Sequence, residues 1–252
     1  MSRLLTIDMG NSRTKWGIFE LDNGDIHAQG LLAGDGDIPE SWQECTRVAI
    51  ANVAGKEQQD VLGRRLEALG LPVRWHLSGL HACGLENAYT IPEQLGIDRW
   101  ATMVASWQYY RDSCLVVNAG TALAINMIEH MTQTQGRFIG GIIVPGLRLM
   151  RSSIMGAAAN IEMEHDGEYM SFPVNTRDAV HSGSLQAMCG AVNNMLQLLN
   201  ERCGQRVPCI LSGGDASALL PLLEEHGLAK EYRLEENLVL RGLLCLERAE
   251  MA

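Results

Sequence analysis

The sequence lacks the signatures of several broad protein classes. No window approaches the roughly 18 uninterrupted apolar residues that a membrane span requires, and the N-terminal segment has no signal-peptide pattern. Basic residues are few, with 20 lysines and arginines against 30 acidic residues and a net charge of −10. This balance argues against a protein that binds nucleic acid or anionic membranes. We therefore expect a cytoplasmic protein.

Several catalytic and binding motifs are also absent. The chain has no GxxxxGK[ST], which excludes a Walker-type nucleotide site, and no GxGxxG, which weakens a dinucleotide-binding interpretation. It has no GxSxG motif of serine hydrolases, and its 7 histidines show no HxxxH or HxxEH spacing. Its 7 cysteines form no CxxC pair, so a zinc site is not expected, and such scattered thiols are typical of a reducing cytosol.

What remains is the composition of a globular protein with many turns. Hydrophobic residues make up 46% and charged residues 20% of the 252 residues, which is enough for one large domain or two half-size ones. Aromatic residues reach only 5%, whereas there are 26 glycines, so tight turns and close backbone approaches are expected.

The order of apolar segments predicts an α/β fold. A hairpin is expected over residues 4–7 and 14–20, and a strand at 47–55, a helix at 56–70 and a strand at 72–77 indicate a parallel crossover. Further along we expect a helix over 97–112 with Asp98 as its N-cap, and then a second interrupted strand over 113–130. A strand and a helix are expected over 136–154, with the helix beginning near Pro145. The remaining predicted elements are a helix over 175–204, a strand and helix over 207–227, and a last helix over roughly 235–249.

An internal repeat divides this chain. The segments LLTIDMGNSRTKWGIF and LVVNAGTALAINMI share one pattern, in which an apolar strand is followed by Asp or Asn, any residue, Gly, Asn or Thr, and a second strand. The repeat aligns three pairs of residues at an offset of 110, namely Asp8 with Asn118, Gly10 with Gly120, and Asn11 with Thr121. It predicts two similar α/β lobes that face one another, residues 1–112 and 113–252.

The first hairpin has the residue types of a phosphate site. Gly10 lets backbone N–H groups approach an anion, Asn11 and Ser12 add donors, Lys15 adds positive charge, and Asp8 can hold Mg²⁺ directly or through water. An ordinary β-hairpin with a polar turn would account for the same residues without any phosphate site. The second hairpin, in which Gly120 and Thr121 could contact the far phosphates, favours the phosphate interpretation, because chance rarely repeats both pattern and register.

Two other stretches combine glycine with acidic residues. In YTIPEQLGIDRWA, Asp98 precedes Arg99, and a carboxylate beside a guanidinium stays ionised, as a proton-accepting base must. An N-cap aspartate beside a solvated arginine explains this pair equally well. In ILSGGDAS, two glycines at a helix start suit either a ligand against bare backbone or a tight strand-to-helix turn.

Taken in order, these segments resemble the type III pantothenate kinases. The matching motifs are DMGNSRTK, GIDR with Tyr89 seven residues before its Gly96, NAGTALAIN, GGIIVPG and NTRDAV. This family belongs to the superfamily of acetate kinase, sugar kinases, heat-shock ATPases and actin. The resemblance implies two ribonuclease H-like lobes, a duplicated actin-like ATPase fold, with a cleft between them.

The resemblance also implies a reaction and the residues that perform it. The reaction is the ATP- and Mg²⁺-dependent phosphorylation of pantothenate to 4′-phosphopantothenate, the first step of coenzyme A biosynthesis, with Asp98 as general base. The implied pantothenate-binding residues are Tyr89, Gly96, Ile97, Asp98, Arg99 and, across the interface of a homodimer with shared sites, Thr176. The implied ATP-binding residues are Asp8, Met9, Gly10, Asn11, Ser12, Arg13, Thr14, Lys15 and Thr121.

The chain departs from the family at Asn118 and Asn126, where aspartates are usual. The first of these positions is associated with a bound monovalent cation, K⁺ or NH₄⁺. An Asn carbonyl contributes no negative charge, so we expect a weaker cation site or none. The intact GIDR motif favours an active kinase, but two alternatives stay open here: a non-catalytic accessory or regulatory protein, because the family overlaps the Bvg accessory factors, and a related kinase for a sugar or small acid.

Overall fold

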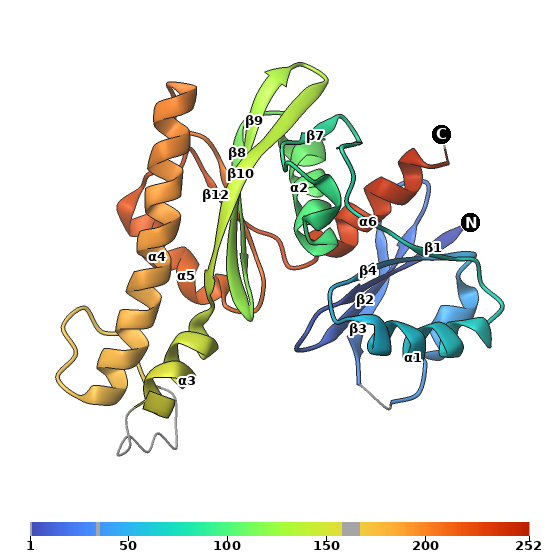
Figure 1. The fold of residues 1–252 in the computed structure, drawn as a ribbon, viewed down its shortest axis with the longest axis horizontal. Helices are drawn as coiled ribbons and strands as arrows, with labels where there is room; N and C mark the ends of the chain where they lie inside the picture. The colour runs from blue at the N-terminus through green and yellow to red at the C-terminus, as the bar shows by residue number, and fades with distance from the viewer. Residues whose placement is uncertain (1, 34–35, 158–166, 252) are drawn as a thin grey trace. The chain divides into compact units, whose positions relative to one another are not determined.

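The computed structural model describes residues 2–33, 36–157 and 167–251 as a mixed α/β protein (Figure 1). The chain divides into two compact units. The first unit is Met1–Arg111, His130–Phe138 and Asn237–Ala252, and the second is Asp112–Glu129 and Ile139–Glu236. Within the described ranges, no helix has both the length and the apolar character needed to cross a membrane.

The first unit contains a five-stranded sheet in the order β3-β2-β1-β4-β5. Its antiparallel strands are β1 (Arg3–Met9), β2 (Thr14–Glu20) and β3 (Ile26–Leu32). β4 (Arg47–Asn52) and β5 (Val73–Trp75) run parallel to β1, and α1 (Lys56–Glu67) connects them. The predicted hairpin and the strand–helix–strand crossover are both confirmed.

Alternation along β1 separates the two faces of this sheet. Leu5, Ile7 and Met9 join a buried cluster with side chains of α1 and of the short helix η1 (Glu40–Glu44). Asp8 therefore belongs to the opposite face of the strand. Helices α2 (Ile97–Tyr110) and α6 (Leu238–Ala249) pack together in this unit, and α6 contacts β1 and β4.

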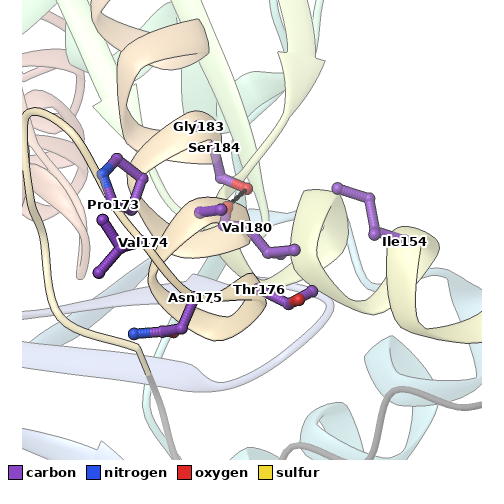
Figure 2. A pocket seen from close by; sticks show the side chains of 9 residues that line it. Ile154, Pro173, Val174, Asn175, Thr176, Val180, Gly183 and Ser184 are labelled. Atoms are coloured by element: carbon purple, nitrogen blue, oxygen red, sulfur yellow. Dashed lines mark hydrogen bonds between the residues drawn. The ribbon is translucent and has the colours of Figure 1, made fainter.

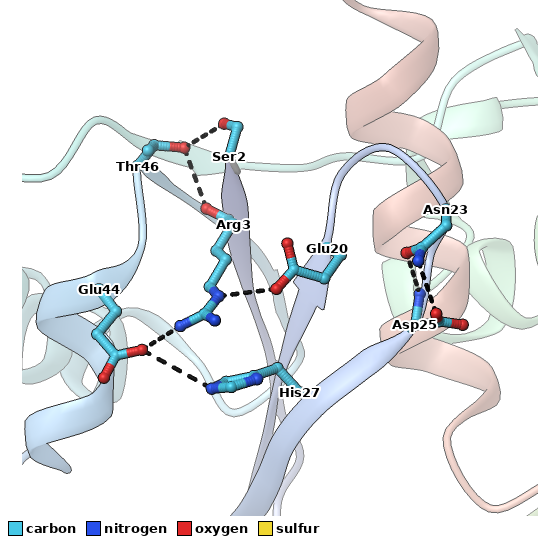
Figure 3. A network of polar contacts seen from close by, with 8 residues as sticks. All are labelled: Ser2, Arg3, Glu20, Asn23, Asp25, His27, Glu44 and Thr46. Atoms are coloured by element: carbon cyan, nitrogen blue, oxygen red, sulfur yellow. Dashed lines mark hydrogen bonds and ion pairs between the residues drawn. The ribbon is translucent and has the colours of Figure 1, made fainter.

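Polar contacts tie β1 to its neighbours at its first residues (Figure 3). The Arg3 guanidinium contacts the carboxylates of Glu20 and Glu44, with 2.9 Å between Arg3 Nε and Glu20 Oε1. The hydroxyls of Ser2 and Thr46 lie 2.8 Å apart. This network holds the end of β1 that is farthest along the strand from Asp8.

A small β-structure precedes α2 in the first unit. It consists of β6 (His81–Ala82) and β7 (Leu85–Asn87), followed by the short helix η2 (Pro92–Gln94). Residues Gly136–Phe138 run parallel to β7. This pairing brings Phe138 beside Asn87, although 50 residues separate them in the sequence.

The second unit is built around β8 (Cys114–Ala119), which pairs antiparallel with β9 (Ala122–Thr132) and parallel with β11 (Cys209–Ser212). Beyond these strands lie β10 (Gln135–Pro145) on one side and β12 (Tyr232–Leu234) on the other. The complete order of this sheet is β12-β11-β8-β9-β10-β7-β6, in which β9 and β10 contribute residues to both units.

Among the described residues of the second unit, the helices are α3 (Leu147–Ala157), α4 (Thr176–Cys203) and α5 (Ala216–His226). The core contains Leu115, Val117 and Ala119 of β8 together with apolar side chains of α4 and α5. The N-cap of α4 is Asn175, whose Oδ1 accepts a hydrogen bond from the Asp178 N–H over 3.0 Å. The predicted start of this helix is confirmed.

The internal repeat corresponds to a duplicated sheet topology. The order β3-β2-β1-β4-β5 in one unit matches β10-β9-β8-β11-β12 in the other, with the same strand directions at β1 and β8. The inward residues keep the offset of 110, because Leu5, Ile7 and Met9 correspond to Leu115, Val117 and Ala119. The lobe boundaries 1–112 and 113–252 stay a prediction; α6 packs within the first compact unit.

Candidate active site

Asp8 stands where β1 ends, directly opposite Lys15 in the register of the β1–β2 hairpin. Its side chain is partly buried. The pKa of the Asp8 carboxyl is raised to about 7, mainly by burial and also by the nearby charge of Asp98, while Lys15 opposes the rise. Asp8, Lys15 and Asp98 are therefore neighbours within the first unit.

The turn between β1 and β2 exposes the residues predicted to contact ATP. The Gly10 N–H donates to the Arg13 carbonyl over 3.2 Å, and the three residues from Asn11 to Arg13 are exposed. The side chain of Met9 is buried in the core, so only its backbone is available at this edge. Thr14 and Lys15 are partly buried at the start of β2.

Asp98 lies in the first turn of α2. The prediction that Asp98 is the N-cap is wrong, because the helix begins at Ile97 and Gly96 occupies the N-cap position. Asp98 Oδ1 instead accepts a hydrogen bond from the Arg99 N–H over 2.8 Å. A Cβ on Gly96 would lie 2.6 Å from that same oxygen, so glycine at this position gives the carboxylate its room.

Burial is the largest influence on Asp98. It raises the pKa of this carboxyl, while the Arg99 N–H and the Arg99 charge oppose the rise. The sequence-based expectation that a neighbouring guanidinium keeps Asp98 ionised thus describes the smaller effect. The carboxyl is a stronger proton acceptor than an exposed aspartate.

Arg99 and Tyr89 contact each other. The buried Arg99 guanidinium donates from Nη1 to the Tyr89 hydroxyl over 2.8 Å, and its Cζ lies 5.8 Å from the centroid of the Tyr89 ring. Ile97, two residues before Arg99 in the chain, is also buried, with 4% of its surface exposed. The predicted substrate residues of the first unit therefore include one hydrogen-bonded pair.

Two further residues at this pair were missed by the sequence analysis. Phe138 places its ring centroid 5.9 Å from Arg99 Cζ and 5.5 Å from the Tyr89 ring. Asn87 accepts a hydrogen bond from the Tyr89 N–H over 3.0 Å. An Asn two residues before a Tyr is a signal for such a local turn, whereas nothing in the sequence connects Phe138 with this loop.

A divalent cation at the first unit would depend on few protein ligands. Among the described residues there is no group of three or more His, Cys, Asp or Glu side chains that could hold a metal ion. Mg²⁺ in phosphoryl-transfer sites commonly uses one or two carboxylates together with phosphate oxygens and water. Asp8 fits that pattern, because its carboxylate stands beside a phosphate-type turn.

The equivalent strand end in the second unit is enclosed by glycine. Asn118 is the penultimate residue of β8, and beside it lies Gly213, whose φ is 102°. A Cβ on Gly213 would lie 2.2 Å from the Ala119 carbonyl oxygen and 2.8 Å from Asn118 Oδ1. Asn126 is fully buried, and a Cβ on Gly141 would lie 2.9 Å from its Oδ1. Close packing therefore accounts for Gly213, one of the two glycines in ILSGGDAS.

Thr121 is exposed in the short turn between β8 and β9. Gly120 donates its N–H to the Ala122 carbonyl over 3.0 Å, and Gly146 donates to the Thr121 carbonyl over 3.1 Å. A Cβ on Gly146 would lie 2.1 Å from the Gly120 oxygen, so the glycine after Pro145 is needed for this contact.

Thr176 is the first residue of α4 and lines an open pocket of about 580 Å³ in the second unit (Figure 2). The other lining side chains are mainly apolar and include Ile154 of α3, Pro173, Val174 and Val180. Phe172 and Val174, in the segment that leads into α4, are 88% and 91% exposed.

Comparison with known proteins identifies consistent relatives. Residues 4–198 match the family model described as type III pantothenate kinase. The chain is 59% identical over 248 residues to a type III pantothenate kinase of Methylobacillus flagellatus, covering 98% of this chain and 99% of that protein.

Solved structures share the fold at lower identity. A putative Baf family transcriptional activator from Campylobacter jejuni has a TM-score of 0.57 at 21% identity, covering 95% of each chain. A ROK family glucokinase from Streptomyces griseus, in complex with glucose and AMPPNP, has a TM-score of 0.52 at 12% identity, covering 100% of each chain. These similarities agree with the predicted two-lobe, actin-like fold.

Proposed function

The chain belongs to the type III pantothenate kinase family, and we propose that Asp98 is the general base of its phosphoryl transfer. The family reaction is the phosphorylation of pantothenate by ATP with a divalent metal, the first step of coenzyme A biosynthesis. The observation that carries the assignment is the partly buried Asp98 carboxylate at the start of α2, whose pKa is raised.

Asp98 acts when the primary hydroxyl of pantothenate attacks the γ-phosphorus of ATP. The new oxygen–phosphorus bond forms as the bond from the γ-phosphorus to the bridging oxygen breaks, ADP leaves, and the hydroxyl proton passes to Asp98. Such transfers have a loose transition state, so alignment of the two reactants and charge neutralisation account for most of the catalysis. Burial of the site around Asp98 keeps out water, which would otherwise compete with pantothenate as the acceptor of the phosphoryl group.

ATP binding is assigned to the residues of DMGNSRTK, Asp8 to Lys15, together with Thr121. The paired positions of Asp8 and Lys15 support this assignment, since one attracts Mg²⁺ and the other attracts phosphate. Asp8 would hold Mg²⁺ directly or through water. The bound metal ion would supply charge neutralisation at the phosphates.

Pantothenate binding is assigned to Tyr89, Gly96, Ile97, Asp98 and Arg99, with Thr176 from a second copy of the chain across a dimer interface. The hydrogen bond between Arg99 and Tyr89 supports a preorganised anion-recognising pair, because pantothenate carries a carboxylate. A reducing cytoplasm agrees with the seven free cysteines.

Replacing Asp98 with Asn tests the assignment of the base. We expect kcat to fall about 10²–10⁴-fold, because Asn keeps the side-chain shape but accepts no proton. The measurement is the rate of ADP release that depends on added pantothenate. Asp112→Asn is the matched control, since Asp112 accepts a hydrogen bond from the following N–H over 2.8 Å, as Asp98 does. An Asp98→Asn enzyme with unchanged kcat would remove Asp98 from this role.

We also propose that two copies of the chain form a homodimer. In this dimer the second copy covers the segment that leads into α4. The exposed Phe172 and Val174, next to Thr176, support it. We expect sedimentation of the protein as a dimer, and of the double variant Phe172→Asp, Val174→Asp as a monomer with reduced affinity for pantothenate. The matched control is Leu77→Asp, which is 80% exposed in the first unit and should leave the dimer intact. A monomeric wild-type protein would contradict the proposal.

A further inference from the structure

The contacts around Arg99 extend beyond the residues that the family motifs mark. Its guanidinium is hydrogen-bonded to the Tyr89 hydroxyl and lies near two aromatic rings, those of Tyr89 and Phe138. Arg99 itself is 7% exposed and Phe138 is fully buried. A buried cation gains more from an aromatic face than an exposed one, because less water competes for it.

Asn87 connects three points of the loop that carries Tyr89. Its Oδ1 accepts from the Tyr89 N–H over 3.0 Å, and its Nδ2 donates to the carbonyls of Gly79 and Pro92, each over 3.2 Å. The side chain is 1% exposed. One buried amide therefore fixes where the Tyr89 backbone lies.

Phe138 is linked to the same loop through the sheet. It stands opposite Asn87 in the parallel pairing of β10 with β7, and its carbonyl accepts from the Ala88 N–H over 3.1 Å. The two residues thus hold the Tyr89–Arg99 pair from neighbouring strands. Asn87 does so through the backbone of the loop, and Phe138 does so through its ring.

We propose that Asn87 and Phe138 are positioning residues for pantothenate, which act by presetting the Tyr89 hydroxyl and the Arg99 guanidinium before the substrate binds. The proposal rests on the proposed function, in which Tyr89 and Arg99 contact pantothenate. A preset cation costs less conformational entropy when it binds an anionic group than a mobile one does. Asn87 and Phe138 should consequently affect pantothenate affinity and leave the chemical step unchanged.

The test is a kinetic comparison of ring-removing variants. Phe138→Leu keeps an apolar side chain and removes the π face. We expect KM for pantothenate to rise about 3–30-fold, with kcat within about two-fold and KM for ATP unchanged, from the usual strength of a desolvated cation–π contact. Asn87→Ala should give the same split, and pantothenate Kd from calorimetry should follow KM.

Phe19→Leu is the matched control for loss of a buried ring. Phe19 is also fully buried in the first unit, and Arg241 Cζ lies 6.0 Å from its ring centroid. This variant should lose a similar amount of thermal stability with no change in pantothenate KM. Phe138→Met, which nearly conserves volume without a ring, replaces Phe138→Leu if the latter does not fold.

Two results would overturn the proposal. One is an unchanged pantothenate KM in folded Phe138→Leu or Phe138→Met. The other is a parallel change of kcat and both KM values, which indicates a general structural effect. Wild-type protein that neither binds pantothenate in calorimetry nor releases ADP in its presence would instead overturn the proposed function and this inference together.

Discussion

The two hairpins that open the duplicated sheets differ in charge. At the end of β1, Asp8 stands opposite Lys15, whereas at the end of β8 Asn118 stands opposite Ala124. Both strands have equivalent neighbours in their sheets and apolar residues at the same three inward-facing positions. The topology was therefore retained in both units, while the pair of opposite charges is found at this position only in the first.

The two strand ends also differ in what lies against them. Asp98 is near Asp8, so two carboxylates share a partly buried region. Asn118 has Gly213 as its neighbour, close enough that no Cβ fits between them. The comparison indicates that the first hairpin is built for ionic chemistry and that the second depends on close backbone packing.

Exchanging the acid of the first hairpin for the amide of the second should have the largest effect. We expect Asp8→Asn to reduce kcat about 10²–10³-fold, because a metal-bound phosphate site loses several kcal/mol of charge stabilisation. ADP release at saturating pantothenate measures it. Asn118→Ser, which changes the equivalent amide without removing a charge, should reduce kcat much less. Equal losses in the two variants would contradict the distinction between the hairpins.

Stability against pH shows whether Asp8→Asn acts through charge or through unfolding. The pKa of Asp8 is raised from its ordinary value of 3.8 to about 7 in the folded protein. The folded state thus favours the protonated form, and its stability contribution is present below about pH 4 and lost as pH rises through 7. Asp8→Asn should therefore raise Tm relative to wild type at pH 8 more than at pH 5. A lower Tm at pH 8 would mean that unfolding explains the loss of turnover.

Glycine substitutions after β4 and β11 test the packing side of the comparison. Gly213→Ala should cost about 3–5 kcal/mol, because it combines a strained φ of 102° with a Cβ 2.2 Å from the Ala119 oxygen. Gly55→Ala in the first unit should cost about 1–2 kcal/mol, since its φ is 95° but no atom lies within 4 Å. Urea unfolding measures both. Similar costs would show that backbone strain alone explains the glycine at 213.

Adding a charge to the second hairpin should have the smallest effect. We expect Asn118→Asp to lower the K⁺ concentration for half-maximal activation at least about five-fold, because an added carboxylate attracts a cation by about 1 kcal/mol or more. The measurement is turnover in KCl against tetramethylammonium chloride at equal ionic strength, with Asn118→Ala as the uncharged control. A K⁺ response identical to that of wild type would show that this strand end binds no cation.

Much of the secondary structure could be predicted from local patterns. The β1–β2 hairpin, the crossover through α1 and the start of α4 at Asn175 follow from apolar periodicity, turn residues and a capping side chain. The N-cap of α2 was assigned wrongly because Asp is a common cap, and the sequence does not reveal that Gly96 leaves space for a carboxylate in the first turn.

The sequence by itself determined the α/β class, the repeat at an offset of 110 and the motifs that carry Asp8 and Asp98, since these depend on spacing and turn chemistry along short segments. Only the tertiary structure decided that Phe138 joins Tyr89 and Arg99, and that Asp98 raises the pKa of Asp8. Those contacts join segments far apart in the chain. Packing sets the distances between these side chains and burial sets the strength of their electrostatic interactions. No local sequence pattern encodes the packing or the burial.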